Sequence, residues 1–456
     1  MSKRKNRCAW RAALGALALS GVASAAVPRV ADVTVTENPD QTLTVAYKLT
    51  GAPAIVTLDL VTNAQDGVAA SIGGTNLWEI HGDVGRLVGL EHDFATPYSG
   101  SIRWVPYRTA LKDIDLSSLS VRAEVTAWAT NSPPPYVVVR LNREEDDAYT
   151  NRAYYARRGA GLRFYPSAEQ LPGGLLENDA YRKDQLVLKR VYAAGVEWMM
   201  GSATNAPNRK ADEVPHLVTF SRDYYLGVFE VTLRQRQHIL GIGAIRDGTF
   251  AGYPNFGERA VAPCNNLSYE ALRGSAAVGD VSNAPLPDTD LARLSQKTGL
   301  AFDLPTEAEW EFACRAGLEG PANADVDWTQ EGVDSLEWNT HNATNVIDGA
   351  ATRVVHRVGL KTPNAWGFHD MLGNVWECTR DIYLGESSFA ATFGGKGVSE
   401  PVVDPAVLRA EGIATRVRRG GAYNEQWNGN RASARGGGMG RMETWSGYRV
   451  RCGASF

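Results

Sequence analysis

Two hydrophobic patterns divide the chain. From residue 26 to 142, apolar and polar positions alternate in short runs, such as residues 43–47 (LTVAY) and 122–128 (RAEVTAW). Turn residues such as Asn38-Pro39-Asp40 separate the runs. Alternation with period two puts every second side chain on one face of a strand, and short strands between turns are typical of antiparallel sandwiches. We therefore predict an N-terminal β-sandwich over residues 26–142, roughly of immunoglobulin or fibronectin type.

Residues 185–456 show few long periodic segments and contain many Trp, Gly and Arg residues. One helix is predicted after Thr306, because Glu309 stands three residues later and completes a capping box. Gly317 is expected to end this helix. A second helix is predicted over residues 291–299 (LARLSQKTG).

Residues 143–184 combine charges of both signs with turn-rich stretches such as 171–179 (LPGGLLEND). This composition predicts a linker between the two parts. Near the C-terminus, residues 416–423 (RVRRGGAY) and 447–453 (GYRVRCG) are predicted strands. The fold class predicted for the whole chain is therefore α+β.

The first 25 residues have the features of a secretory signal peptide. A basic stretch ending at Arg11 precedes the apolar run from Ala12 to Leu19, and Ala23-Ser24-Ala25 fits a small-residue cleavage site. An uncleaved anchor is the alternative, but the apolar run is short for a membrane-spanning helix. We expect an exported protein, secreted, periplasmic or on the cell surface, that is not integral to the membrane.

Charge and cysteine content exclude several classes of function. The chain has a net charge of −4, and loss of the basic signal peptide makes it more negative. A nucleic-acid binder needs a basic surface, so no nucleic-acid partner is expected. Four cysteines remain once the signal peptide is removed, and the sequence is compatible either with two disulfides or with free buried thiols. None of these cysteines has the spacing of a zinc site. These are Cys264, Cys314, Cys378 and Cys452.

Residues 367–381 (GFHDMLGNVWECTRD) carry the strongest metal signal. Calcium binds carboxylate and carbonyl oxygens, and Asp370 and Glu377 supply carboxylates. Gly373 allows the sharp turn that points carbonyl oxygens inward. The alternative is a capping Asp and a surface Glu around an ordinary turn.

Four motifs in order resemble the formylglycine-generating enzyme family, also called the sulfatase-modifying factor family. They are EVPHLVTFSRDYYLGVFEVTLRQ (213–235), LPTEAEWEFACRAG (304–317), PNAWGFHDMLGNVWE (363–377) and RRGGAY (418–423). The resemblance covers roughly residues 185–456 and implies a C-type lectin-like fold with much irregular structure. It also implies one structural calcium site, in which Gly373 and Val375 offer carbonyls and Asp370 and Glu377 offer side chains.

The catalytic chemistry of that family is not expected in this chain. Its enzymes bind copper with two cysteines shortly after the RGG turn, and soft thiolates are the ligands that Cu(I) prefers. Residues 420–438 contain no cysteine, with Asn424 and Glu425 near the first thiol position and Asn430 near the second. Copper is therefore not expected. Iron sulfoxide synthases of the same fold use a His-x-x-x-His-x-Glu set, and no two histidines here are four apart.

The first functional hypothesis is a non-catalytic binding module for an extracellular peptide, protein or glycan. Aromatic and polar side chains beside the RGG turn suit such a ligand. The proposed ligand-binding residues are Tyr423, Glu425, Trp427, Asn430 and Arg435. The aromatic residues could instead cover the core, and an oxidoreductase with a different metal centre is the second hypothesis. The arginines of this half are expected mainly to pair with carboxylates such as Glu307 and Glu309.

Overall fold

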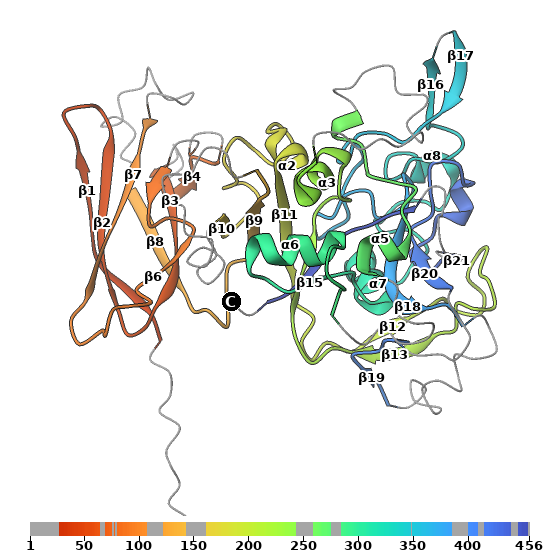
Figure 1. Ribbon diagram of the computed structural model, residues 1–456, viewed down its shortest axis with the longest axis horizontal. Helices are drawn as coiled ribbons and strands as arrows, with labels where there is room; N and C mark the ends of the chain where they lie inside the picture. Colours follow the sequence, from red (N-terminus) through yellow and green to blue (C-terminus); the bar gives the residue numbers. More distant parts are fainter. Residues whose placement is uncertain are drawn as a thin grey trace, which may run out of the picture.

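A computed structural model describes most of the chain. The described residues are 27–63, 69–74, 77, 80–106, 122–142, 161–242, 259–274, 284–347, 349–384, 400–408, 415–438 and 446–454. The predicted signal peptide lies outside them. Figure 1 shows a β-rich N-terminal part beside a larger part that mixes short helices and strands. None of the described helices is both long and apolar enough to cross a membrane.

The N-terminal part contains two antiparallel sheets. The first has the strand order β1-β2-β7-β5, with β1 Arg29–Glu37, β2 Leu43–Thr50, β7 Tyr98–Trp104 and β5 Ile80–Gly82. The second is built on β3 (Ala54–Asn63), which pairs with β4 (Ala69–Ser71), β6 (Arg86–Val88) and β8 (Arg122–Trp128).

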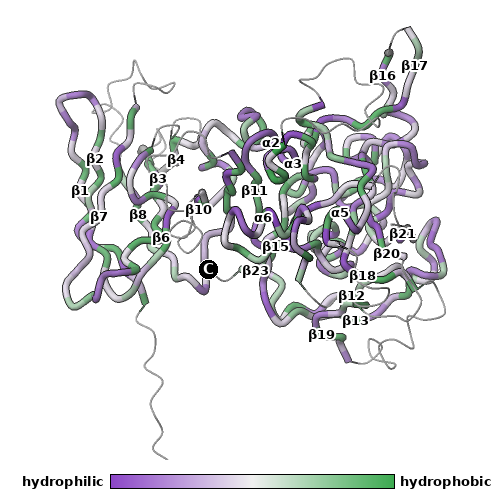
Figure 2. Tube along the Cα trace, in the orientation of Figure 1, coloured by the Kyte–Doolittle hydropathy of each residue, from purple (hydrophilic) through white to green (hydrophobic). Residues whose placement is uncertain are grey.

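Residues from both sheets enclose one core. Along β2, buried and partly buried residues alternate from Leu43 to Thr50, as the sequence pattern predicts, and Figure 2 shows hydrophobic residues recurring along these strands. Val33 and Val35 of β1 are an exception, because they are 38% and 41% exposed in an edge strand. The antiparallel two-sheet arrangement agrees with the sequence; the immunoglobulin or fibronectin type stays a prediction.

The central sheet of the C-terminal part has the strand order β10-β9-β11-β14-β23-β15. The strands are β9 Tyr136–Arg140, β10 Leu162–Tyr165, β11 Gln185–Val191, β14 Tyr224–Gly227, β15 Phe302–Asp303 and β23 Arg451–Gly453.

β9 was expected in the N-terminal sandwich, but it pairs with β11 along its whole length, from Gln185↔Arg140 to Lys189↔Tyr136. The segment predicted as a linker, 143–184, contains β10 and the short helix α2 (Ala180–Lys183). The structure therefore places β9 and β10 in the same sheet as β11, while the boundaries at 142 and 184 stay a prediction. The physical reason is that β9 is buried at four consecutive positions, which is typical of a strand inside a covered sheet rather than of an alternating one.

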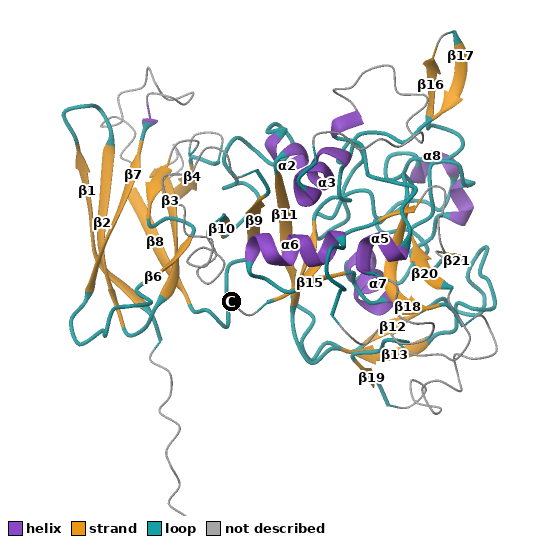
Figure 3. Ribbon diagram, in the orientation of Figure 1, coloured by secondary structure: helices purple, strands orange, loops and turns teal. Residues whose placement is uncertain are grey.

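Short helices pack around this sheet, as Figure 3 shows. They are α3 Leu233–Leu240, α5 Tyr269–Arg273, α6 Asp290–Thr298, α7 Glu307–Arg315 and α8 Gln330–Val333. The predicted capping box of α7 is present, because Glu309 N donates to Thr306 Oγ1 and Thr306 N donates to Glu309 Oε2. α6 ends at Gly299, as predicted, whereas Ala316 and then Gly317 take the left-handed positions after α7.

Smaller sheets complete the C-terminal part. β20 (Arg416–Arg419) lies between β21 (Arg435–Gly438) and β18 (Trp376–Ile382), and β22 (Ser446–Gly447) pairs with β18. β12 (Trp198–Met200), β13 (His216–Thr219) and β19 (Val402–Val403) form a second sheet, and β16 (Thr344–Ile347) and β17 (Ala350–Arg353) form a projecting hairpin. The four described cysteines are all buried, and the choice between disulfides and buried thiols stays open.

We predict that a fragment beginning at Gln185 folds poorly, whereas one beginning at Ala129 keeps β9 and β10 and remains stable. Removal of β9 exposes the hydrogen-bonding edge of β11, and unprotected edges promote aggregation. Thermal melting by circular dichroism and size-exclusion chromatography of both fragments would measure this. Equal stability of the two fragments would contradict the placement of β9 in this sheet.

Candidate functional site

The predicted metal loop leads into β18 and has an unusual backbone. Asp370, Gly373 and Asn374 have φ values of 54°, 73° and 54°, in the left-handed region. A Cβ on Gly373 would lie 2.3 Å from the carbonyl oxygen of Trp338, so only glycine fits there. Left-handed backbone at Asp370 and Asn374 is unfavourable, so packing around the loop must hold this shape, as is common at functional sites.

Glu377 is buried and accepts hydrogen bonds from two side chains. Trp310 Nε1 donates to its Oε2 at 2.8 Å, and Arg449 donates to both carboxylate oxygens at 2.8 to 3.2 Å. Arg449 itself is fully buried and also donates to the carbonyl oxygens of Gly227 and His369. The pair therefore ties β18 to the last strand and to β14.

Asp370 and Glu230 are two further buried carboxyl groups beside this pair. Asp370 Oδ2 accepts from Gly359 N at 2.6 Å, but its buried Oδ1 has no hydrogen-bond partner in the structure. Burial raises the pKa of Asp370 to about 6. Glu230 accepts from Asn374 Nδ2 and Val375 N, and burial, followed by the charges of Asp370 and Glu377, raises its pKa well above the usual value.

Carboxylate and carbonyl oxygens are the ligands that a hard divalent cation binds, and Asp370, Glu230 and Glu377 are buried carboxyl groups in this region. Three buried carboxylates surround Arg449, and Asp370 Oδ1 is an oxygen without a donor. No group of three or more His, Cys, Asp and Glu side chains within the described ranges is arranged to hold a metal by side chains alone. Calcium accepts backbone carbonyls together with carboxylates, so a loop of this kind satisfies its requirements only with the carbonyls of Gly373 and Val375 included.

The sequence analysis did not connect Glu230 with this loop, beside which the structure places it. The two are 140 residues apart in the chain, and no local pattern connects them. The signal that could have found it is the carboxylate in an apolar stretch, GVFEVT, because a buried acid needs a partner or a proton.

Three of the proposed ligand-binding residues share one loop. Tyr423, Glu425 and Trp427 are half-buried and follow the glycine turn after β20, and Trp427 begins the 3-10 helix η4 (Trp427–Gly429). The Trp427 ring lies 5.4 Å from that of Trp328, at an angle of 60°. Trp376 Nε1 donates to Glu425 Oε1 at 3.4 Å. This loop is the part of the predicted surface that the structure brings together.

Asn430 and Arg435 do not belong to that surface, which corrects their assignment. Asn430 is fully buried and packs so tightly that a Cβ on Gly421 would lie 1.8 Å from its Oδ1. Arg435 is 6% exposed and donates to both oxygens of Glu307, at 2.6 and 2.9 Å. A guanidinium held in this way is not available to a ligand at the surface.

The other arginines of this half also pair with carboxylates, as expected. Arg431 donates to both carboxylate oxygens of Glu213. Burial raises the pKa of Glu213, but the ion pair and hydrogen bonds outweigh burial and lower this pKa to about 2. Other buried or half-buried pairs include Arg419–Glu307, Arg419–Glu311 and Arg451–Glu309. These arginines are part of the framework and do not form an anion site.

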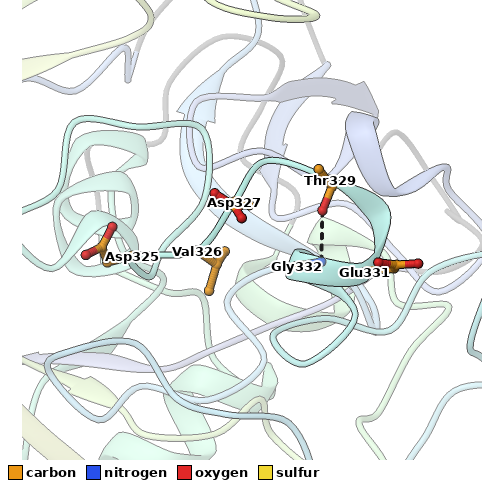
Figure 4. Close-up of a pocket in the computed structure, with 6 residues that line it drawn as sticks. All are labelled: Asp325, Val326, Asp327, Thr329, Glu331 and Gly332. Atoms are coloured by element: carbon orange, nitrogen blue, oxygen red, sulfur yellow. Dashed lines mark hydrogen bonds between the residues drawn. The ribbon is translucent and has the colours of Figure 1, made fainter.

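A pocket of about 550 Å³, drawn in Figure 4, lies at the start of α8. Its lining residues are Asp325, Val326, Asp327, Thr329, Glu331 and Gly332. Sequence reasoning missed this pocket. The signal was present, because residues 317–352 contain no Lys or Arg and many acidic residues.

Comparisons with known proteins agree with this organisation. A family model described as "Sulfatase-modifying factor enzyme 1-like domain" matches residues 180–452. The formylglycine-generating enzyme of Mus musculus is 30% identical over 129 residues, which are 26% of this chain and 30% of that protein. The enzyme of Streptomyces coelicolor is 34% identical over 128 residues, 26% of this chain and 35% of that protein. The matched region thus spans about a third of these relatives.

Two solved structures are similar at low sequence identity. PvdO from Pseudomonas aeruginosa has a TM-score of 0.45 and 24% identity, covering 59% of this chain and 94% of that one. Treponema denticola variable protein 1 has a TM-score of 0.43 and 22% identity, covering 59% and 95%. Because the family model matches more than half of its residues, the chain belongs to the family of the sulfatase-modifying factor enzyme 1-like domain.

Proposed function

We propose that the C-terminal domain is a non-catalytic binding module. The observation that carries this proposal is the loop between β20 and β21. It contains no cysteine, and it carries Tyr423, Glu425 and Trp427. The Trp427 ring contacts Trp328, whose chain neighbours Asp327 and Thr329 line the acidic pocket. A pair of thiols is the copper ligand expected from the resemblance, and amide and carboxylate side chains do not replace soft thiolates. What remains is an aromatic and acidic surface suited to recognition.

The charge of this surface favours a basic ligand. Asp325, Asp327 and Glu331 are exposed around the pocket, and the neighbouring loop adds Glu425. Aromatic faces next to carboxylates bind ammonium and guanidinium groups through cation–π and ionic contacts. An extracellular peptide or protein segment with Lys or Arg therefore fits better than a neutral glycan, and export by the predicted signal peptide would bring the module to such partners.

The second candidate is an oxidoreductase of the formylglycine-generating class with another metal centre. Membership of the family is the observation that keeps it open. Activity of that kind needs redox-competent ligands near the loop, and Cys452 and Cys378 are buried in the core instead.

We also propose that the loop from Asp370 to Glu377 holds one structural calcium ion. Asp370 Oδ1 and the carbonyls of Gly373 and Val375 would be ligands, with Glu230 and Glu377 supplying further negative charge. The ion would offset buried carboxylate charge and stabilise the left-handed backbone. It would act on the fold, since the loop leads directly into β18.

Chelation should lower the melting temperature of the wild-type protein. A ligand that binds only the folded state stabilises it by RT ln(1 + [L]/Kd), about 2.7 kcal/mol at a hundredfold excess over Kd. Asp370→Asn should abolish the difference between calcium and chelator. Asp404→Asn, a change at an exposed carboxylate outside the loop, is the control and should retain it. If the melting temperature of the wild-type protein does not change when chelator is added, the proposed calcium site is wrong.

A sulfatase-type cysteine peptide incubated with the protein, copper and oxygen should keep its mass. The reason is the absence of cysteine from residues 420–438. Mass spectrometry of the peptide is the measurement, with a formylglycine-generating enzyme as positive control. Conversion of the thiol to an aldehyde would establish the oxidoreductase and refute the binding module as the whole function.

Trp427→Ala should weaken binding of a Lys- and Arg-rich peptide while leaving the fold intact. Trp427 is half-buried, so the loss of stability should be well below the ~3–5 kcal/mol of truncating a buried Trp. Tyr192→Ala is the control, because Tyr192 is 54% exposed on a different element. Calorimetric titration of both variants, with a neutral glycan as a second ligand, would measure this. Unfolding of Trp427→Ala, or unchanged affinity, would show that the loop is not the binding surface.

A further inference from the structure

Glu337 is a buried carboxyl group without a cationic partner. It is fully buried in the turn that follows α8, where its Oε1 accepts from Asn339 Nδ2 at 2.9 Å. Its Oε2 is buried and has no hydrogen-bond partner among the described residues. By contrast, buried Glu213 is paired with Arg431, and buried Glu307 is paired with Arg435. A charged carboxylate in this position would lack the partner that its burial requires.

Asn430 lies on the other side of this carboxyl group and ends η4. Its side-chain amide is close enough to Glu337 to lower the pKa of that carboxyl group, and its Nδ2 donates to the carbonyl oxygen of Ala422 at 3.4 Å. The Asn430 Oδ1 atom is buried and has no partner in the described structure. Two acceptor oxygens, one on each residue, thus lack a donor.

We propose that Glu337 is a neutral, protonated acid in the folded protein, and that its contact with Asn430 positions η4 and thereby Trp427. A proton on Glu337 turns one of the two acceptors into a donor, for which the amide oxygen of Asn430 is an unpartnered acceptor. The contact joins the turn after α8 to the loop that carries the aromatic pair. The effect of this contact on ligand binding by Trp427 rests on the proposed function, whereas the protonation state of Glu337 does not.

The charges around Glu337 are consistent with the neutral form. Burial raises its pKa most, and nearby Asp334 raises it further, while Asn339, Asn430 and Lys361 lower it; the net direction is upward. The Lys361 ammonium is directed elsewhere, since it donates to the carbonyl oxygen of Asp334 and lies 4.0 Å from the centre of the Trp338 ring. The Asp334 carboxylate is itself engaged by His341.

The pH dependence follows from linkage. The folded pKa lies above the usual value of 4.5, so the folded state binds more protons than the unfolded state between these two values. The stabilisation by Glu337 is complete below pH 4.5 and is lost as the pH rises through the folded pKa. Gln has the shape of the neutral acid and cannot ionise, so it should preserve the contact at every pH.

Melting temperatures of full-length wild type, Glu337→Gln and Glu337→Ala from pH 4.5 to 9 would test the proposal. Glu337→Gln should match wild type at low pH and exceed it increasingly as the pH rises, and Glu337→Ala should melt lower at low pH. Glu311→Gln is the matched control: it removes a buried charge that Arg419 and Arg315 need, and should lower the melting temperature at neutral pH.

If Glu337→Gln melts as low as Glu337→Ala, Glu337 is charged and paired with a cation, and the proposal is wrong. A difference between Glu337→Gln and wild type that does not change with pH would also overturn it. The measurement needs no ligand, so its outcome is independent of whether Trp427 contributes to binding.

Discussion

Buried pairs of arginine and carboxylate hold the irregular part of this protein together. Arg419, Arg431, Arg435 and Arg449 are each at most 6% exposed, and each is paired with a buried glutamate. Removing a guanidinium from water is costly, and the cost is offset when a carboxylate and carbonyl oxygens accept most of its hydrogen bonds. These pairs join segments up to 218 residues apart, so they fix loops that no helix or sheet supports.

This framework explains how a loop can change its chemistry without changing its position. Arg419 anchors the start of the segment after β20, and Arg431 and Arg435 anchor its end. The interval between the anchors, residues 420–430, contains Tyr423, Trp427 and Asn430. The family resemblance places redox thiols in this interval, and the present chain places aromatic, amide and carboxylate groups there. Function resides in such a site and not in the fold that carries it.

Local signals predicted local structure well. The capping box at Thr306 and Glu309 and the glycine after α6 gave the correct helices, because caps depend on residues within one turn. β9 was misplaced because its partner strand is set by a long-range pairing that leaves no local trace. Arg435 was assigned to the surface by its proximity in sequence, which does not determine where a side chain points. Glu230 and Glu337 became visible only when contacts between distant segments were known.

The most direct measurement of this account is a double-mutant cycle on Arg431 and Glu213, using Arg431→Met, Glu213→Gln and the double variant in chemical denaturation. Each single change leaves a buried polar group without its partner, so we expect both to be strongly destabilising, by about 3–5 kcal/mol. The double variant should be much less destabilised than their sum, with a coupling energy of about 2–3 kcal/mol. Additive effects with no coupling would contradict the claim that this pair anchors the loop.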